Sequence, residues 1–441
     1  MGLKYVEQVK SAVLILLIVL SVTLTFSIWT YKPNYEPIEK APTADVSIAD
    51  KRKIEDIIKP YKLLANSEEG LKGTTDQKVL GEFVDNVKTW TFQDLTLSDP
   101  EVTAADLNEI VGKPGRLVLF FPAPIPFGVI DNLFKFTDSV SNESSFERII
   151  IEKPDASGRI AVHFAGGEGG RMFTAMARGV EQAKLNEFLT RAETFPSYAV
   201  VKRQGARSLY LPDEPASVDE LNYLMEEVSP SQFRRALFGD KNTVKREQGG
   251  SCREEYSDNA AIMSVDTCMK TLSYVYPHTN AENKEVSIPS ELLLGSLDFI
   301  NQHGGWTNDF VFAAMDPIKR QVEFRLQLRG YPVFSNTTWT HITQVWGDGR
   351  IFRYMRPYYS LDGPFPGKGQ SILEAGTDAA EWLRAKKGDD FSEIGEIMQG
   401  YTMRQGEQAN LYLLEPAWYY KENGTWKQVK PEEGGAANGL E

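Results

Sequence analysis

Histidine is the residue type that most often binds metals or transfers protons, and in this sequence it is sparse and scattered. The sequence has four histidines, His163, His278, His303 and His341. They form no HExxH motif and no i,i+4 pair that would place two imidazoles on one helical face. No nucleophile elbow, serine–lysine pair or cysteine with a matching histidine accompanies them. We therefore predict no metal site, no cofactor and no catalytic residue, with most histidines at the surface or at interfaces.

Two other patterns admit a functional and a structural interpretation. The GGEGG run at 166–170 lacks the Gly-Lys-Ser/Thr ending of a phosphate loop, so a hairpin loop is favoured. An aromatic-rich stretch at 339–359 could form a binding face, but two sides of a packed sheet are the favoured interpretation. Its aromatic residues include Trp346, Phe352, Tyr354, Tyr358 and Tyr359.

Two cysteines, Cys252 and Cys268, exclude a disulfide framework and a four-cysteine zinc site. One bond closing this short loop and two free buried thiols both remain open from the sequence.

Composition limits the classes of partner. The chain has 441 residues, 41% hydrophobic and 25% charged, with a net charge of −13. This composition is typical of globular domains with substantial cores. An acidic chain without clustered Lys and Arg is a poor nucleic-acid ligand, so we exclude nucleic acid as a partner.

The most distinctive segment is SAVLILLIVLSVTLTFSIW at 11–29, which is free of charged residues over 19 positions. A helix of this length spans the hydrocarbon core of a bilayer, so a transmembrane helix is predicted. Lys4 and Lys10 precede it, whereas Glu36 and Glu39 follow it. The positive-inside rule then places residues 1–10 in the cytoplasm and the bulk of the chain outside, as a single-pass protein of the cell membrane.

The flanks of this segment favour a retained anchor over a cleaved signal peptide, because no small-x-small cleavage site follows it. Residues expected at the two membrane interfaces are Lys4, Lys10, Trp29, Tyr31 and Lys32.

Small hydroxyl residues within the span lie one helical turn apart. The two pairs are Ser21 with Thr25, and Thr23 with Ser27. Such pairs allow close helix approach in lipid, which predicts a partner helix. Hydrogen bonds back to their own helix are an equally weighted alternative.

The remaining sequence predicts an α+β protein of antiparallel sheets packed with helices. Proline-rich residues 30–50 are expected to form a juxtamembrane linker. Three domains follow, at 51–145, 146–250 and 251–441. Helical spacing of apolar residues predicts helices at 53–64, 76–90, 103–112, 181–193, 216–238, 290–303 and 370–388. Alternating segments predict a meander at 146–179, a hairpin turn at 347–349 and a terminal hairpin at 411–429.

Four segments resemble the YycH (WalH) family of Gram-positive bacteria: the membrane span running into WTYKPNYEPIEK, RGYPVF, WGDGRIFRYMRPYY and LYLLEPAWYY. The GYPVF and PAW segments are also similar to the YycI family, which suggests a shared C-terminal sheet module. This resemblance implies a non-catalytic accessory regulator of the WalK (YycG) sensor histidine kinase, which controls cell-wall metabolism genes.

The resemblance further implies that the helix at 11–29 packs against kinase helices and that a YycI-like membrane protein is a partner. A homodimer is left open, and the sign of regulation cannot be carried over. The alternative hypothesis is a cell-surface binding module for a wall polymer, with a wall hydrolase third.

Overall fold

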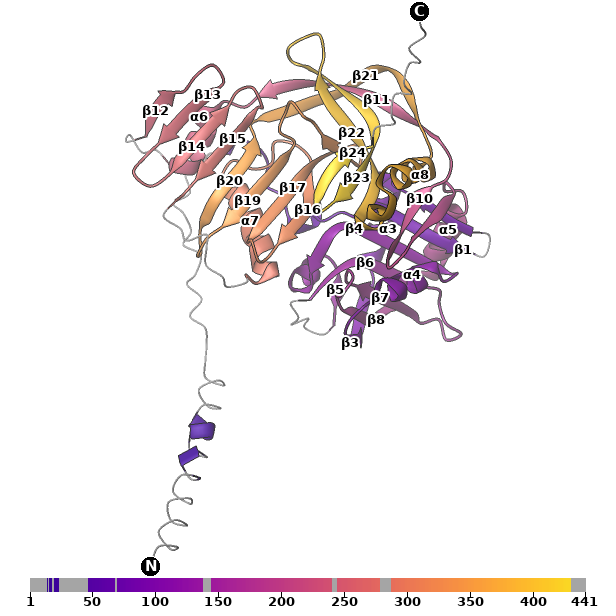
Figure 1. The fold of residues 1–441 in the computed structure, drawn as a ribbon. Coiled ribbons are helices and arrows are strands. Elements are labelled where there is room, and N and C mark those ends of the chain that lie inside the picture. The colour runs from indigo at the N-terminus through magenta and orange to yellow at the C-terminus, as the bar shows by residue number, and fades with distance from the viewer. Residues whose placement is uncertain are drawn as a thin grey trace, which may run out of the picture. The chain divides into compact units, whose positions relative to one another are not determined.

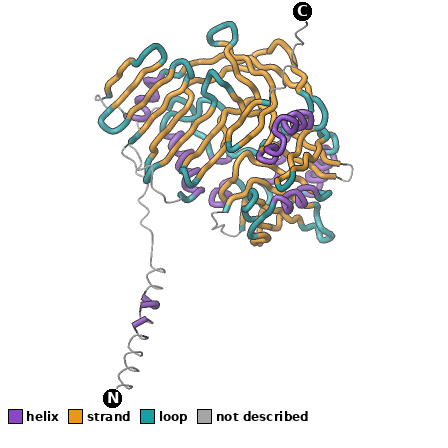
Figure 2. The backbone as a smooth tube through the Cα atoms, viewed as in Figure 1, coloured by secondary structure: helices purple, strands orange, loops and turns teal. Residues whose placement is uncertain are grey.

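The computed structural model describes most of the chain between residues 47 and 429. The described residues are 14, 16–17, 20–23, 47–67, 70–137, 144–239, 244–277 and 287–429, of which 366–368 are described by their backbone alone. Contacts within the chain divide it into two units, Met1–Lys40 and Ala41–Glu441. Strands are the main secondary structure in the described part of the second unit (Figure 2).

The predicted membrane span lies mostly outside the described residues. Its described positions, 14, 16–17 and 20–23, have helical backbone and exposed side chains. Among the described residues, none of the helices combines the length and the hydropathy that a membrane span requires. The span therefore stays a prediction.

Within the described residues, eight strands form the first sheet, which is coloured indigo to magenta in Figure 1. All neighbours in it are antiparallel except β3 and β5. Its order is β2 (Gly70–Thr74), β1 (Lys62–Ser67), β4 (Arg116–Pro126), β6 (Ser145–Glu152), β7 (Ile160–Ala165), β8 (Met172–Arg178), β3 (Thr91–Asp99) and β5 (Lys135–Phe136).

Short amphipathic helices cover the two faces of this sheet. The helices of this region are α2 (Ile54–Ile57), α3 (Gln77–Val87), α4 (Ala104–Gly112), η1 (Phe127–Asn132) and α5 (Gln182–Ala192). Helix α3 buries Leu80, Phe83 and Val87, spaced so that they share one face. Its N-terminus is capped by Asp76, whose carboxylate accepts from the Lys78 amide at 2.8 Å. Local sequence thus fixes where each helix begins and which face it buries.

A second sheet of 14 strands within the described residues carries the rest of the fold, and it is coloured magenta to yellow in Figure 1. Strands β18 and β22 pair in parallel, and the other pairings are antiparallel. Its strands run in the order β12 (Lys245–Gln248), β13 (Arg253–Ser257), β14 (Ile262–Asp266), β15 (Thr271–Val275), β20 (Ile351–Pro357), β19 (His341–Trp346), β17 (Gln321–Leu328), β18 (Tyr331–Phe334), β22 (Ile394–Gln405), β23 (Leu411–Glu422), β11 (Ala216–Glu227) and β21 (Tyr359–Leu373), with β16 (Phe310–Asp316) on β17 and β24 (Thr425–Gln428) on β23. Its helices are α6 (Pro230–Phe238), α7 (Pro289–Gln302), α8 (Gly376–Lys387) and η2 (Gly388–Glu393).

A separate hairpin, β9 (Tyr198–Arg203) with β10 (Ala206–Pro212), lies between the two sheets. Alternate residues of β10 point to opposite sides, as in any strand. Tyr210 packs in a core with β4, β6 and α4 of the first sheet. Leu209 and Leu211 pack in another core with α8, β22 and β23. The hairpin therefore contributes to both cores at once.

Most predicted elements are confirmed. Helices α3, α4, α5 and α7, the meander β6–β7–β8 and the hairpin turn at 347–349 all form where expected. The GGEGG run is the loop between β7 and β8. The α+β class is likewise confirmed.

Three helix predictions were wrong in part, because strand pairing overrode local helical spacing. Residues 216–227 are β11, which pairs with both β21 and β23, and only 230–238 are helical. Segment 53–64 has only the short helix α2 before Pro60 and β1. Residues 370–373 end β21, so α8 begins at Gly376.

Strand pairing also runs across both predicted domain boundaries. Strand β4 pairs with β6 across position 146, and β12 pairs with β13 across position 251. The three-domain division stays a prediction.

Cys252 and Cys268, whose state the sequence left open, form a disulfide with Cα atoms 5.5 Å apart. They flank β13 and β14, so the bond closes the open end of this hairpin. Cys268 is exposed, which excludes a pair of buried thiols.

The prediction that most histidines lie at the surface or at interfaces is wrong for His303; His278 lies outside the described residues. His303 is buried at the end of α7 and stacks on Phe299 with ring centres 4.0 Å apart. His163 and His341 are half-buried on strands. Within the described chain, no group of three or more His, Cys, Asp or Glu side chains could hold a metal ion.

His341 should make stability depend on pH. Its Nδ1 is buried without a hydrogen-bond partner among the described residues. Burial lowers its pKa to about 4, although Glu323 on β17 acts in the opposite direction. An unfolded histidine titrates near 6.5. As the pH falls from about 6.5 to 4, the unfolded state takes up a proton that the folded state does not, so the free energy of unfolding falls by up to about 1.4 kcal/mol per pH unit.

We predict that His341→Phe, which keeps a ring against Trp339, loses less stability than the parent between pH 7 and pH 5. Urea denaturation at both pH values measures the difference. Equal losses in the two proteins would contradict the assignment to His341.

Candidate functional site

A row of charged and aromatic side chains crosses the first sheet next to the central hairpin. Lys62 on β1 is in register with Phe120 on β4, and Phe120 is in register with Arg148 on β6. The three side chains therefore lie on one face. The Lys62 ammonium and the Arg148 guanidinium lie 4.8 Å and 5.1 Å from the Phe120 ring centre, within cation–π range.

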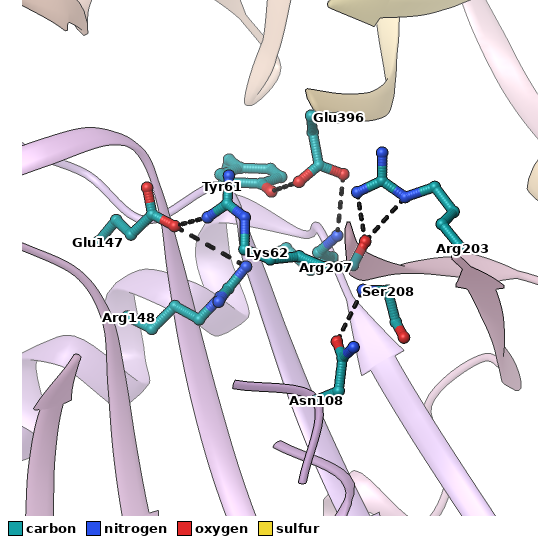
Figure 3. Close-up of polar contacts among 9 residues, drawn as sticks. All are labelled: Tyr61, Lys62, Asn108, Glu147, Arg148, Arg203, Arg207, Ser208 and Glu396. Carbon is teal, nitrogen blue, oxygen red and sulfur yellow. Dashed lines mark hydrogen bonds and ion pairs between the residues drawn. The ribbon is translucent and has the colours of Figure 1, made fainter. Parts of the chain in front are cut away.

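The first sheet is joined to the second by a buried charged contact (Figure 3). The Tyr61 hydroxyl donates to Glu396 Oε2 on β22 at 2.6 Å. Lys62 Nζ lies 3.5 Å from Glu396 Oε1 and donates to the Tyr210 carbonyl of the hairpin at 3.1 Å. Glu396 thus binds both Tyr61 and Lys62. Through Lys62, the first sheet, the hairpin and the second sheet are connected at this carboxylate.

The hairpin contributes two arginines to the same place (Figure 3). Arg207 forms a hydrogen-bonded ion pair with Glu147 of β6. Arg203 donates instead to backbone carbonyls, those of Arg207 and Ile394. Near the turn of the hairpin, Asn108 of α4 accepts from the Ser208 amide at 2.7 Å. These contacts fix the hairpin relative to both sheets.

A cleft of about 370 Å³ opens over this cluster. Its walls come from the first sheet, the hairpin and strands β22 to β24, and they combine rings, prolines and charges. The lining residues are Tyr61, Phe120, Phe121, Pro122, Pro124, Glu147, Arg148, Arg207, Glu393, Gly395, Glu396, Met398, Lys421, Asn423, Gly424 and Trp426. This volume falls in the usual range for small-molecule sites, roughly 300–1,000 Å³.

Arg148 is the least compensated charge in the cleft wall. Its side chain is 6% exposed, and its Nε has no hydrogen-bond partner among the described residues. A carboxylate oxygen of Glu147 lies 3.8 Å from Nη2 and is already bonded to Arg207. A buried donor left without a partner costs about 1–3 kcal/mol.

Lys421 is a second cation of the wall. It lies opposite Glu396 in the β22–β23 register, with its ammonium 5.8 Å from the Trp426 ring centre. Burial lowers its pKa, and Glu323 and Glu147 counteract that effect.

Ionisation of the central pair follows from its contacts. Burial raises the pKa of Glu396, but Lys62, the Tyr61 hydroxyl and Arg148 outweigh burial, so the net pKa is lowered. Burial lowers the pKa of Lys62, and Glu396 opposes the shift. The pKa of Tyr61 is raised by burial and by Glu396. The site therefore holds charges in fixed positions, an arrangement suited to binding.

The residues predicted from sequence lie elsewhere. Ser21 and Thr23 fall in the described helical positions, whereas Thr25, Ser27 and the interfacial residues 4, 10, 29, 31 and 32 lie outside the described residues. The aromatic stretch at 339–359 is mainly core: Trp346, Tyr354, Tyr358 and Tyr359 are all buried, and Phe352 is half-buried. The packed-sheet interpretation is confirmed. The alternative, an aromatic binding face, would need exposed rings, and most of these rings are buried.

Sequence reasoning missed the cleft residues altogether. One signal was present: in FERIIIE, Arg148 shares the face of Ile150, which faces an apolar core. A charge at an inward position of a strand is rare unless it has a role. Glu396 and Lys421, which line the same cleft, are far away in sequence and could not be inferred.

Comparisons with known proteins agree with this architecture. A family model described as YycH protein, C-terminal domain, matches residues 206–433, and one described as YycH protein, N-terminal domain, matches residues 7–169. The chain belongs to the YycH family. The cleft is lined by residues of both matched ranges, since Arg148 falls in the range of the N-terminal domain model and Glu396 in that of the C-terminal domain model.

Two relatives illustrate the similarity within the YycH family. A Bacillus subtilis (strain 168) protein named "Two-component system WalR/WalK regulatory protein YycH" is 21% identical over 436 residues, 95% of each chain. The crystal structure of YycH from Bacillus subtilis matches with a TM-score of 0.73 at 18% identity, covering 87% of this chain and 99% of that one. The structural match shows that the YycH fold is shared.

The Lys62–Glu396 contact should be costly to break from one side. We predict that Glu396→Leu lowers the free energy of unfolding by about 3 kcal/mol, because it leaves the Lys62 ammonium buried and unpaired. The double variant Lys62→Met with Glu396→Leu should recover most of that loss, because it removes both charges. Urea denaturation measures both.

Glu415→Leu is the matched control, because Glu415 pairs with Arg404 at the surface. An exposed pair contributes at most about 1 kcal/mol. A Glu396→Leu loss no larger than that of the control would show that the buried contact does not hold the sheets together.

Proposed function

We propose that this chain is a membrane-anchored, extracytoplasmic regulator of a two-component sensor histidine kinase of the WalK type. The observation that carries the proposal is similarity over 95% of both chains to a protein named as a WalR/WalK regulatory protein. Matches to both YycH domains support it, since they cover each half of the chain. The proposed role is non-catalytic, and a YycI-like membrane protein is the proposed second partner.

The proposed anchor is the uncharged segment 11–29, with residues 1–10 in the cytoplasm. A regulator of this kind acts by packing its helix differently against two signalling states of the kinase. A difference of about 1–3 kcal/mol between those states changes their populations severalfold to more than a hundredfold. The outer unit must then influence how the linker, predicted at residues 30–50, presents the helix.

The end of the predicted linker and the residues after it are held by a set of contacts that we call the clasp, formed by residues 48–52 and 301–309, where α7 leads into β16. The Ala49 amide donates to the Gly304 carbonyl at 3.0 Å. Arg52 and Asn301 exchange two hydrogen bonds, of 2.9 Å and 2.8 Å. Arg52 Nη1 also bonds Asp309 at 2.7 Å.

Gly305 permits the closest approach in the clasp. Its φ is +71°, and a Cβ atom there would lie 2.2 Å from the Ala49 carbonyl oxygen. Only glycine allows this contact, because any other residue would collide with the backbone of the incoming chain. The clasp is therefore a fixed point from which the outer unit could control the linker.

The first test of the proposed function is co-purification. Full-length protein, crosslinked and extracted in mild detergent, should recover a WalK-type kinase and a YycI-like protein. Recovery of neither would overturn the proposal.

The helix contact has its own variants within that test. Ser21→Leu with Thr25→Leu should reduce kinase recovery by about tenfold, because added bulk prevents close packing while leucine stays favourable in lipid. Thr23→Leu with Ser27→Leu is the matched control on another helical face. Full recovery and normal regulation with both double variants would show that the contact is not made by this helix.

A second prediction concerns the clasp. Gly305→Ala should release residues 48–52 and weaken regulation in a kinase reporter strain without reducing membrane insertion. Hydrogen exchange of the Ala49 amide should rise at least tenfold, since its bond to Gly304 would be displaced.

Gly349→Ala is the matched control, because it imposes the same backbone strain at φ +67° but meets nothing within 4 Å. Unchanged exchange at Ala49 in Gly305→Ala would contradict the geometry. Changed exchange with unchanged regulation would show that the clasp does not transmit the signal.

A further inference from the structure

We propose that the cleft between the two sheets is a binding site for a small organic anion, one that carries a carboxylate or phosphate on an apolar or ring-bearing body. The inference concerns ligand binding alone and goes beyond the proposed regulation of a kinase.

The first argument is the balance of charge in and behind the cleft wall. Three cations line the cleft, Arg148, Arg207 and Lys421, with Lys62 and Arg203 behind them. Three carboxylates also line it, Glu147, Glu393 and Glu396. The lining is therefore balanced in charge, in a chain whose net charge is −13. Attraction of an anion then depends on which of these charges are already paired.

The second argument is which of these charges are already satisfied. Glu147 is bonded to Arg207, and Glu396 is bonded to Tyr61 and paired with Lys62. The acids inside the cleft are therefore occupied, and Glu393 is exposed at its rim. Among the described contacts, Arg148 has only a Glu147 oxygen 3.8 Å from its Nη2, which it shares with Arg207, and Lys421 has no carboxylate within ion-pair distance. Both belong to the cleft wall, one from each sheet.

The third argument is the buried Nε of Arg148. A guanidinium donor that is buried and has no partner is destabilising in an empty site. An arginine presents donors in a planar fork that matches carboxylate and phosphate oxygens. Its side chain is held in place by the Phe120 ring, so the donors are positioned before a ligand arrives. This pre-positioning favours binding over a role in folding.

The fourth argument is the apolar part of the wall. Tyr61, Phe120, Phe121 and Trp426 surround the charges together with Pro122 and Pro124. Rings beside fixed charges are the usual composition of a small-molecule site. The volume of about 370 Å³ accommodates a ligand the size of a substituted ring, whereas an extended polymer would not fit inside it.

The test is isothermal titration calorimetry on the full chain in detergent with three probes of similar size. Phenyl phosphate and benzoate are the anions, and benzamide is the neutral control. We expect both anions to bind at least tenfold more tightly than benzamide. Equal affinity for all three probes, or no binding of either anion, would overturn the proposal.

Two variants locate the site. Arg148→Met and Lys421→Met should each weaken phenyl phosphate binding by about tenfold, which corresponds to the loss of one charge-assisted hydrogen bond. Arg404→Met is the matched control, because its guanidinium lies on the surface against Glu415, and it should bind like the parent. Thermal melting of each variant confirms folding, and Lys421→Met, half-exposed in the wall, serves if Arg148→Met fails to fold.

Unchanged affinity in Lys421→Met and in any folded Arg148→Met would overturn the assignment to this cleft. A hexaglutamate peptide that bound more tightly than phenyl phosphate would overturn the small-molecule occupant in favour of an acidic segment of a protein. Because no kinase is present in these titrations, their failure leaves the co-purification result untouched, and the reverse also holds.

Discussion

The fold depends on the hairpin β9–β10, whose opposite faces contribute to different cores. Tyr210 belongs to the core of the first sheet, and Leu209 and Leu211 belong to the core beneath α8. Two sheets of this size could be linked by one loop and move freely, since interfaces between domains within a chain are commonly polar and mobile. Here the alternation of a single strand buries apolar side chains on both sides, so separating the sheets would expose both faces of the hairpin to water. Buried residues of the two sheets also share the main core directly, so the hairpin adds a second connection beside that core, and the cleft is lined by the hairpin and by both sheets.

The charges at this junction follow from the same geometry. Glu396 on β22 faces Tyr61 and Lys62 at the start of β1, and Lys62 also donates to the Tyr210 carbonyl of the hairpin. Burial of Lys62 is tolerated because Glu396, the Tyr210 carbonyl and the Phe120 ring together replace its hydration. Such a pair adds little stability compared with apolar packing, but it fixes which groups face each other. Arg148 lacks an equivalent set of partners, and this difference between two neighbouring cations marks the cleft as a place for binding.

Local sequence predicted much of the fold and little of the site. Helices α3 and α4 carry their caps and their apolar spacing within about a dozen residues, so they could be placed without tertiary information. Strand β11 could not, because its conformation is imposed by β21 and β23, which lie more than 130 residues further along the chain. The cleft is harder still. Its wall combines residues from β4, β6, β10, β22 and β23, and no local pattern shows that Arg148 and Lys421 line one cavity. The prediction for His303 was wrong for a related reason, since its burial is decided by packing against Phe299 and the core around it.

The clasp and the cleft are also neighbours along the chain, which bears on how binding could influence a membrane helix. Arg52 is fixed to the second sheet through Asn301, and Tyr61 reaches Glu396 of the same sheet from the start of β1. Only eight residues separate them, and Ile54, Ile57 and Ile58 of this bridge are buried in the main core. A bridge fixed at both ends cannot absorb a shift of β1 by local flexing, because each of its buried side chains would have to repack. An anion bound between Arg148 and Lys421 would contact both sheets, and any displacement of the first sheet that it caused would reach the clasp through this bridge. Under the proposed function, the clasp is where the linker to the membrane helix meets the outer unit. Ligand binding in the cleft and the position of the helix would then be coupled by a short, packed segment rather than by a long pathway through the sheets.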